Sequence, residues 1–170
     1  IGQRDCTDVL MQGLEKLEYR GYDSAGIAVF EKTGIKTVKT KGKLADMRHK
    51  LDIEGSPVGH CGIGHTRWAT HGEPSDINSH PHTNGRVTIV HNGIIENYIE
   101  LKEFLTEKGY TFTSQTDTEV VACLLDYYYS ERNPLRAITE TLKELKGSYA
   151  LGIIFRDFPD RVYATRKESP

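Results

Sequence analysis

Residues 97–147, NYIELKEFLTEKGYTFTSQTDTEVVACLLDYYYSERNPLRAITETLKELKG, contain three successive helical patterns. The first pattern ends at a glycine, the second begins with Thr116 and Glu119 in the spacing of a capping box, and the third has Pro134 in its first turn. We therefore expect the helices to span the segments 97–109, 115–132 and 134–147.

Short β-type runs lie on both sides of this helical segment. They occupy residues 26–31, 35–40, 58–69 and 86–93 before it, and 148–157 and 161–167 after it. A doubly wound parallel sheet needs strands and helices in strict alternation, which this order does not provide. The sequence therefore predicts an α+β fold with mixed, mainly antiparallel sheets and segregated helices.

Residues 5–20 have the pattern of one further amphipathic helix. Leu10, Leu14 and Leu17 recur on one face, with charged residues between them, and Gly21 is a natural end.

Composition limits the class of protein. The 170 residues fit one domain, and a net charge of -2 gives no field that would attract nucleic acid. There is no apolar run long enough for a membrane span and no apolar core of a signal peptide. The chain has three cysteines, Cys6, Cys61 and Cys123, and this odd number favours a reducing compartment over a disulfide framework. We expect a cytoplasmic domain without nucleic-acid or membrane partners.

Both ends of the sequence look interrupted. The final segment, 162–170, stops directly after a predicted strand, and Ile1 begins abruptly. We expect residues 1–170 to be one domain that is truncated at both ends.

The segment GHTRWATHG, residues 64–72, has a composition that suits a ligand site. It places Arg67 and Trp68 side by side after an apolar, glycine-spaced run. A guanidinium group can bind a carboxylate through two parallel hydrogen bonds, and an indole ring can exclude water from a bound ligand.

Two interpretations are open for VHNGII, residues 90–95. Asn-Gly between β-type flanks is a strong hairpin signal. Alternatively, the Asn92 amide and the Gly93 backbone N–H form an oxyanion hole, where a glycine lets a ligand approach closely. The helix expected directly after this run leaves little room for a partner strand, which weakens the hairpin interpretation.

Two other residues have both a structural and a functional interpretation. Asp117, in QTDTE (115–119), fits a helix start, or it binds the ammonium group of a ligand. Arg20 either complements the end of the first helix or positions a group in a site.

Six histidines lie between His60 and His91, which raises the possibility of a metal site. The segment lacks Cys-x2-Cys and His-Glu-x-x-His, and His80 and His82 have no companion at zinc-like spacing. We therefore expect no metal, and expect these histidines to form hydrogen bonds in loops and in the core.

Together these residues suit the recognition of an α-amino acid. Arg67 offers a fork for a carboxylate, Asp117 a counter-charge for an ammonium group, and Asn92 with Gly93 an oxyanion hole. No nucleophile is identifiable from the residues alone.

Four stretches closely resemble the glutaminase domain of the glutamine–fructose-6-phosphate aminotransferase family, within the class II glutamine amidotransferases. The resemblance covers essentially the whole chain, and the segment between the early strands and residue 64 is compact, as in bacterial members. It implies the αββα sandwich of the N-terminal-nucleophile hydrolases, with two mostly antiparallel sheets. The four stretches are LEYRGYDSAGIAV, GIGHTRWATHGEPSDINSHPH, IVHNGIIENY and SQTDTEVVA.

The resemblance also implies roles for individual residues. Arg67 is expected to bind the α-carboxylate of L-glutamine, Asp117 its α-amino group, and Trp68 to cover the site from a mobile loop. Asn92 and Gly93 are expected to form the oxyanion hole. The remaining implied residues are Arg20, which positions the nucleophile, and Thr70 and His71, which shape the pocket.

In this family the nucleophile is an N-terminal cysteine, whose free amine can take up the thiol proton. The sequence begins at Ile1, and we assign no catalytic role to Cys6, Cys61 or Cys123. We expect this chain to lack the nucleophile and to be inactive by itself.

The resemblance implies an enzyme that hydrolyses L-glutamine and transfers the ammonia to fructose 6-phosphate, giving glucosamine 6-phosphate and glutamate. Fructose 6-phosphate would bind to isomerase domains that this chain lacks, and the parent enzyme is expected to be a homo-oligomer without a cofactor. Two alternatives remain open: another class II amidotransferase, such as amidophosphoribosyltransferase, and a non-catalytic glutamine-binding module.

Overall fold

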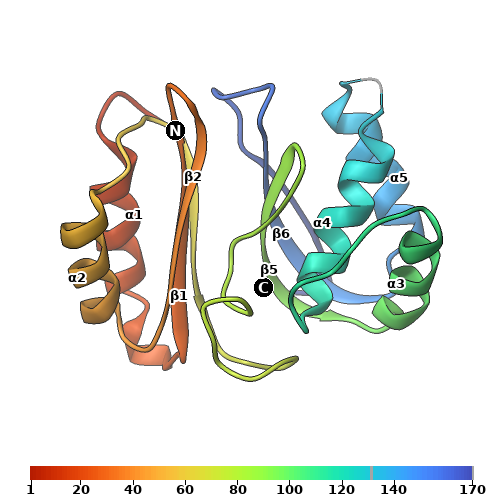
Figure 1. Ribbon diagram of the computed structural model, residues 1–170, viewed down its shortest axis with the longest axis horizontal. Helices are drawn as coiled ribbons and strands as arrows, with labels where there is room; N and C mark the ends of the chain where they lie inside the picture. Colours follow the sequence, from red (N-terminus) through yellow and green to blue (C-terminus); the bar gives the residue numbers. More distant parts are fainter. Residues whose placement is uncertain (131, 170) are drawn as a thin grey trace.

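The computed structural model describes residues 1–130 and 132–169, which form a four-layer sandwich of helices, sheet, sheet and helices (Figure 1). Neighbouring strands within each sheet are antiparallel. The predicted α+β sandwich of two antiparallel sheets is therefore confirmed. In spatial order, the first sheet contains β2 (Gly34–Lys41), β1 (Ser24–Glu31) and β3 (Gly62–Arg67), and the second contains β4 (His82–Asn84), β5 (Val87–Ile95), β6 (Gly147–Phe155) and β7 (Tyr163–Lys167).

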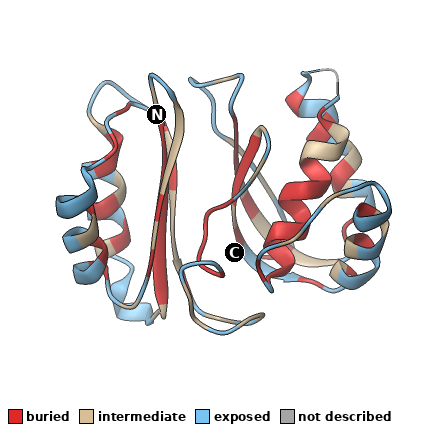
Figure 2. Cartoon of the chain, in the orientation of Figure 1, coloured by how far each residue is buried: buried red, intermediate tan, exposed pale blue. Residues whose placement is uncertain are grey.

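The helices cover the outer faces of the two sheets (Figure 1). The first sheet is covered by α1 (Cys6–Glu15) and α2 (Leu44–Glu54), and the second by α3 (Tyr98–Glu107), α4 (Asp117–Tyr128) and α5 (Pro134–Glu144). Figure 2 shows that α4 is buried along most of its length. No helix among the described residues has the length and apolar character needed to cross a membrane.

Strand β1 explains how the layers are held together, because its side chains alternate between two cores. Ile27 and Val29 pack outward among the helices α1 and α2, whereas Ala28 and Phe30 pack inward with Ile154 of the second sheet. These four side chains of β1 are all buried, as expected for a central strand with two covered faces.

The N-terminal part differs from the prediction at several points. The helix expected over 5–20 ends at Glu15, and a 3-10 helix, η1 (Glu18–Arg20), follows it. Helix α2 and the short strand β4 were not predicted. The expected strand over 58–69 is confined to β3, because the residues before Gly62 form a loop whose carbonyl groups bind the start of α1.

The three helices predicted over 97–147 are present, with ends shorter than expected. Thr116 caps α4, because its Oγ1 accepts a hydrogen bond from the N–H of Glu119 at 3.2 Å. The reciprocal half of a capping box is not formed: the carboxylate of Glu119 instead accepts hydrogen bonds from Thr113 and Ser114. The first turn of α4 is therefore tied to the loop before it.

Candidate functional site

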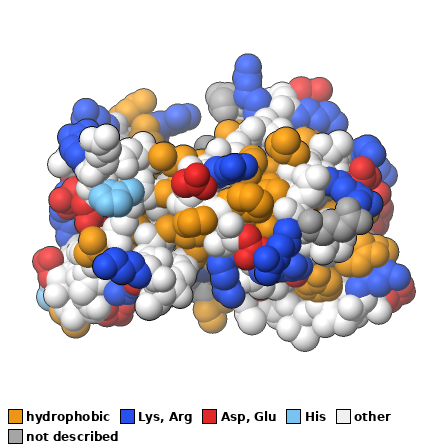
Figure 3. Space-filling view, turned by 90° about the horizontal axis from the view of Figure 1, so that it is seen from above, with side chains coloured by type: hydrophobic (Ala, Val, Ile, Leu, Met, Phe, Trp, Pro, Cys, Tyr) orange, Lys and Arg blue, Asp and Glu red, His pale blue; other side chains and the backbone are white. Residues whose placement is uncertain are grey.

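A cavity of about 1090 Å³ is lined from both sheets and from the start of α4. Ligand pockets commonly have volumes of roughly 300–1,000 Å³, so this cavity is large for a small metabolite. Hydrophobic side chains gather along the middle of one face of the molecule, above the region where the two sheets meet (Figure 3). All the site residues expected from the sequence line this one cavity: Arg20, Arg67, Trp68, Thr70, His71, Asn92, Gly93 and Asp117.

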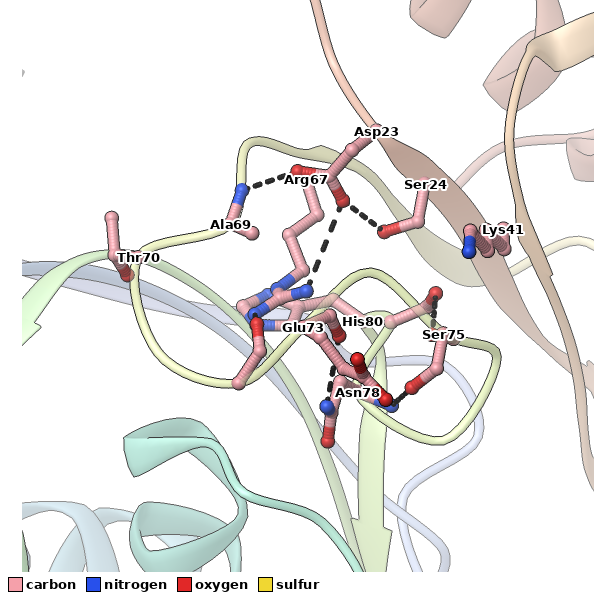
Figure 4. A network of polar contacts seen from close by, with 12 residues as sticks. Asp23, Ser24, Lys41, Arg67, Ala69, Thr70, Glu73, Ser75, Asn78 and His80 are labelled. Carbon is pink, nitrogen blue, oxygen red and sulfur yellow. Dashed lines mark hydrogen bonds and ion pairs between the residues drawn. The ribbon is translucent and has the colours of Figure 1, made fainter.

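Arg67, the last residue of β3, is 4% exposed, and one of its nitrogens makes no hydrogen bond among the described residues. Its Nη2 donates hydrogen bonds to the carbonyl groups of His71 and Gly72. Its Nη1 lies 3.8 Å from Oδ1 of Asp23 and has no hydrogen-bond partner among the described residues. Figure 4 shows the guanidinium group between Asp23 and the loop that follows β3. A buried cationic donor of this kind suits a carboxylate ligand.

Asp117 is the first residue of α4 and is 3% exposed. Its Oδ2 accepts a hydrogen bond from the backbone N–H of Ile95 at 2.9 Å, which fixes the orientation of the carboxylate. Its Oδ1 is 3.4 Å from Oγ1 of Thr118, and Oδ2 is 3.9 Å from Nδ1 of His91. The cavity therefore contains a fixed negative charge as well as the positive charge of Arg67.

Asn92 is held by His65, which the sequence analysis did not single out. Nε2 of His65 lies 2.7 Å from Oδ1 of Asn92, so the Asn92 Nδ2 group stays free to donate toward the cavity. Burial lowers the pKa of His65 to about 4, and the ring is neutral near pH 7. A neutral ring that donates through Nε2 keeps Nδ1 unprotonated, and this atom is buried without a partner among the described residues.

Gly93 lies within a strand and not in a hairpin turn. Strand β5 continues to Ile95, and Asn92 and Gly93 pair with Ala150 and Tyr149 of β6. The backbone at Gly93 has φ +120°, and a Cβ built there lies 2.1 Å from the carbonyl oxygen of Ser148. From the sequence, we expected a glycine here because it lets a ligand approach closely. The structure adds a second reason for a glycine, namely the close packing of this residue against β6.

The remaining expected residues lie at the edge of the cavity. Trp68 is 69% exposed, and its ring packs on Gly21, where a built Cβ would lie 2.6 Å from Cζ3. Arg20 and Thr70 are exposed, and the ring of His71 packs edge-on against Tyr98 with 5.1 Å between centroids. The backbone of this loop is held at its start, because Ala69 donates its N–H to Oδ2 of Asp23.

Histidines that line the cavity form a hydrogen-bonded group with Thr118. Oγ1 of Thr118 lies 2.9 Å from Nδ1 of His91 and 3.1 Å from Nε2 of His80, and the rings of His65 and His80 stack at 4.5 Å. Burial lowers the pKa of His80 and of His91. Among the described residues, the histidines, cysteines and carboxylates form no cluster of three or more that could hold a metal ion.

Residues 65–168 match the family described as "Glutamine amidotransferase domain". The chain belongs to this family. The match includes Arg67, Asn92, Gly93 and Asp117, so most of the cavity lies within the region that defines a glutamine amidotransferase domain.

Two curated relatives of this glutamine amidotransferase domain carry the same name. The chain is 55% identical over 172 residues to the glutamine–fructose-6-phosphate aminotransferase (isomerizing) of Clostridium tetani. It is 57% identical to the protein of the same name from Clostridium perfringens. Each alignment covers 100% of this chain and 28% of the relative, so the chain spans little more than a quarter of their length.

Solved structures with the same fold include other amidotransferases. The glutamine phosphoribosylpyrophosphate amidotransferase from B. subtilis aligns with a TM-score of 0.77 and 28% identity, covering 91% of this chain and 34% of that one. A structure titled as the allosteric regulatory enzyme of purine biosynthesis aligns with a TM-score of 0.76 and 29% identity, over 88% of this chain and 33% of that one. These likenesses agree with the expected N-terminal-nucleophile hydrolase sandwich.

Proposed function

We propose that this chain binds and hydrolyses L-glutamine within a larger enzyme that transfers the ammonia to fructose 6-phosphate. Relatives more than half identical to the whole chain carry the name of that enzyme. The observation that carries the proposal is the buried Nη1 of Arg67, which makes no hydrogen bond among the described residues; Arg67 lines the same cavity as the fixed carboxylate of Asp117. An α-amino acid has the complementary pair of charges on one carbon atom.

In the proposed complex, Nη1 of Arg67 binds the α-carboxylate of glutamine and Asp117 binds its ammonium group. The side-chain amide then reaches Asn92 and Gly93, whose N–H groups stabilise the negative oxygen of the tetrahedral intermediate. Thr70 and His71 border the ligand, Trp68 covers it, and Arg20 positions the nucleophile. All four residues line the cavity.

The proposed nucleophile is the N-terminal cysteine that the family resemblance implies. Its thiolate attacks the carbonyl carbon of the side-chain amide, ammonia leaves with the thiol proton, and water then cleaves the thioester to give glutamate and the free thiol. The cysteines of this chain do not suit this step, because all three are buried and none lines the cavity. Burial also raises the pKa of Cys6, of Cys61 and of Cys123, the last to about 12. Ammonia would then pass to fructose 6-phosphate, giving glucosamine 6-phosphate, in a cytoplasmic homo-oligomer.

The test is the complete parent enzyme supplied with L-glutamine and either fructose 6-phosphate or phosphoribosyl pyrophosphate. We expect glutamate and glucosamine 6-phosphate only with the first acceptor. Activity with phosphoribosyl pyrophosphate would favour a purine-type amidotransferase, for which the solved structures give some support at 28% and 29% identity. Absence of glutamine hydrolysis would favour a binding module.

Arg67→Ala tests the assignment of the carboxylate site. A hydrogen bond to a charged group contributes about 1.5–3 kcal/mol, so we expect the KM for glutamine to rise roughly 10- to 150-fold with a smaller change in kcat. Arg48→Ala is the matched control, because Arg48 is half-exposed and pairs with Glu15 on the outer helices. An unchanged KM in Arg67→Ala would remove the role assigned to this arginine.

A further inference from the structure

Asn78 is a buried amide that none of the roles above uses. It is 3% exposed and lies at the end of the loop after β3. Its Oδ1 accepts a hydrogen bond from the N–H of Gln115 at 3.0 Å, and its Nδ2 donates to Oε1 of Gln115 at 3.1 Å and to the carbonyl oxygen of Glu73 at 2.9 Å. We call this set of hydrogen bonds between Asn78, Gln115 and Glu73 the amide clasp. Figure 4 shows Asn78 beside Glu73, within the loop that follows β3.

One end of the amide clasp adjoins the carboxylate site. Nη2 of Arg67 donates to the carbonyl groups of His71 and Gly72, which immediately precede Glu73. Gly72 packs directly on the clasp: a Cβ built there would lie 2.7 Å from Nδ2 of Asn78 and 2.9 Å from Cβ of Gln115. The carbonyl groups that orient Arg67 therefore rest on the amide clasp.

The other end of the clasp adjoins the ammonium site. Gln115 precedes Thr116, the N-cap of α4, and Asp117, its first residue. The segment before Gln115 is itself fixed, because the carboxylate of Glu119 accepts hydrogen bonds from the N–H of Thr113 at 3.0 Å and of Ser114 at 2.6 Å. The clasp thus joins the backbone that orients Arg67 to a rigid helix start that contains Asp117.

We propose that Asn78 is a positioning residue that sets the separation between Arg67 and Asp117 and so makes the site selective for α-amino acids. This inference rests on the proposed function. The two charged groups of an α-amino acid are held at one fixed separation, whereas Arg67 ends strand β3, Asp117 begins helix α4, and the two are 50 residues apart in the sequence. A site that selects ligands by the separation of their charged groups must hold Arg67 and Asp117 at a fixed distance, and a direct link between the two segments does so.

The test is steady-state glutamine hydrolysis by the complete parent enzyme with Asn78→Ala. We expect the KM for L-glutamine to rise roughly tenfold or more with kcat changed far less, because the variant loses the three hydrogen bonds that join the segments of Arg67 and Asp117. A tenfold change corresponds to about 1.4 kcal/mol. We also expect the preference for L-glutamine over glutaramate, which has the same side-chain amide and α-carbon without the amino group, to shrink by a similar factor. Gln115→Ala should act in the same direction.

Asn97→Ala is the matched control, because Asn97 is also a buried amide that joins distant segments. Its Nδ2 donates to the carbonyl oxygen of Glu144 at 2.9 Å and its Oδ1 accepts from the N–H of Lys146 at 2.9 Å, away from the cavity. We expect this variant to lose stability and to keep the wild-type KM and selectivity.

The outcomes separate the two proposals. A wild-type enzyme that does not hydrolyse glutamine refutes the proposed function. If the wild type is active, an unchanged KM and selectivity in Asn78→Ala overturn the clasp, as does an equal rise in KM in Asn97→Ala. If Asn78→Ala does not fold, the solvent-exposed Gln115→Ala decides: unchanged selectivity there rejects the inference.

Discussion

Replacing Gly93 by alanine tests whether close packing against β6 requires a glycine at this residue of the proposed oxyanion hole. A Cβ at residue 93 would lie 2.1 Å from the carbonyl oxygen of Ser148 and 2.8 Å from the Cα of Tyr149, at φ +120°. Backbone conformations of this kind cost about 1–3 kcal/mol for residues other than glycine. The collision adds to that cost, because both nearby atoms belong to the backbone of the paired strand β6.

We therefore expect Gly93→Ala to lower the free energy of unfolding by about 3 kcal/mol or more. A change of 1 kcal/mol shifts Tm by roughly 2–4 °C in a domain of this size, so Tm should fall by about 6 °C or more. Thermal unfolding measures the shift. Gly109→Ala is the control, because Gly109 has φ +90° and a built Cβ there meets no atom within 4 Å. Equal losses of Tm in the two variants would refute the argument from close packing.

Two further predictions concern the buried histidines. Burial lowers the pKa of His65 to about 4 and that of His82 to about 3, whereas a histidine in the unfolded chain titrates near 6.5. The folded protein binds fewer protons below about pH 6.5, so the free energy of unfolding should fall as the pH drops from 6.5 toward 4, by roughly 1.4 kcal/mol per pH unit for each histidine. Urea unfolding near pH 7, 6 and 5 measures this slope, and a flat profile would contradict neutral histidines. His65→Leu removes the hydrogen bond that orients Asn92, so we expect kcat for glutamine hydrolysis to fall roughly 10- to 100-fold with little change in KM; a change confined to KM would be inconsistent with an oxyanion role.

Much of the fold follows from local signals in the sequence. The helix that begins at Asp117 was predictable, because Thr116 and Glu119 have capping spacing, and Asn133 with Pro134 marks the start of the next helix. Helix α2 was missed although Leu44, Met47 and Leu51 are its buried residues. Its apolar stripe is narrow and is surrounded by charged residues, so the helical periodicity of this segment is weak in the sequence.

The charged groups of the site were identifiable from residue types, whereas their supports were not. Arginine, aspartate and an Asn-Gly pair together suit the recognition of an α-amino acid, although Asp117 and the Asn-Gly pair each have a structural interpretation when taken alone. Asn78 is one amide in a polar loop, and only the fold brings it to Gln115, 37 residues away. His65 lies 27 residues from Asn92, and no local pattern predicts that pairing. Residues that position a site through long-range hydrogen bonds leave no periodic signal in the sequence.

The most direct test of the central claim is a crystal structure of the complete parent enzyme with L-glutamate, the product of hydrolysis, bound in the cavity. The account predicts an α-carboxylate oxygen within about 3.2 Å of Nη1 of Arg67. It also predicts the ammonium group against the carboxylate of Asp117 and the γ-carboxylate beside Asn92 and Gly93. A ligand whose α-carboxylate lies away from Arg67, or one bound outside this cavity, would contradict the account.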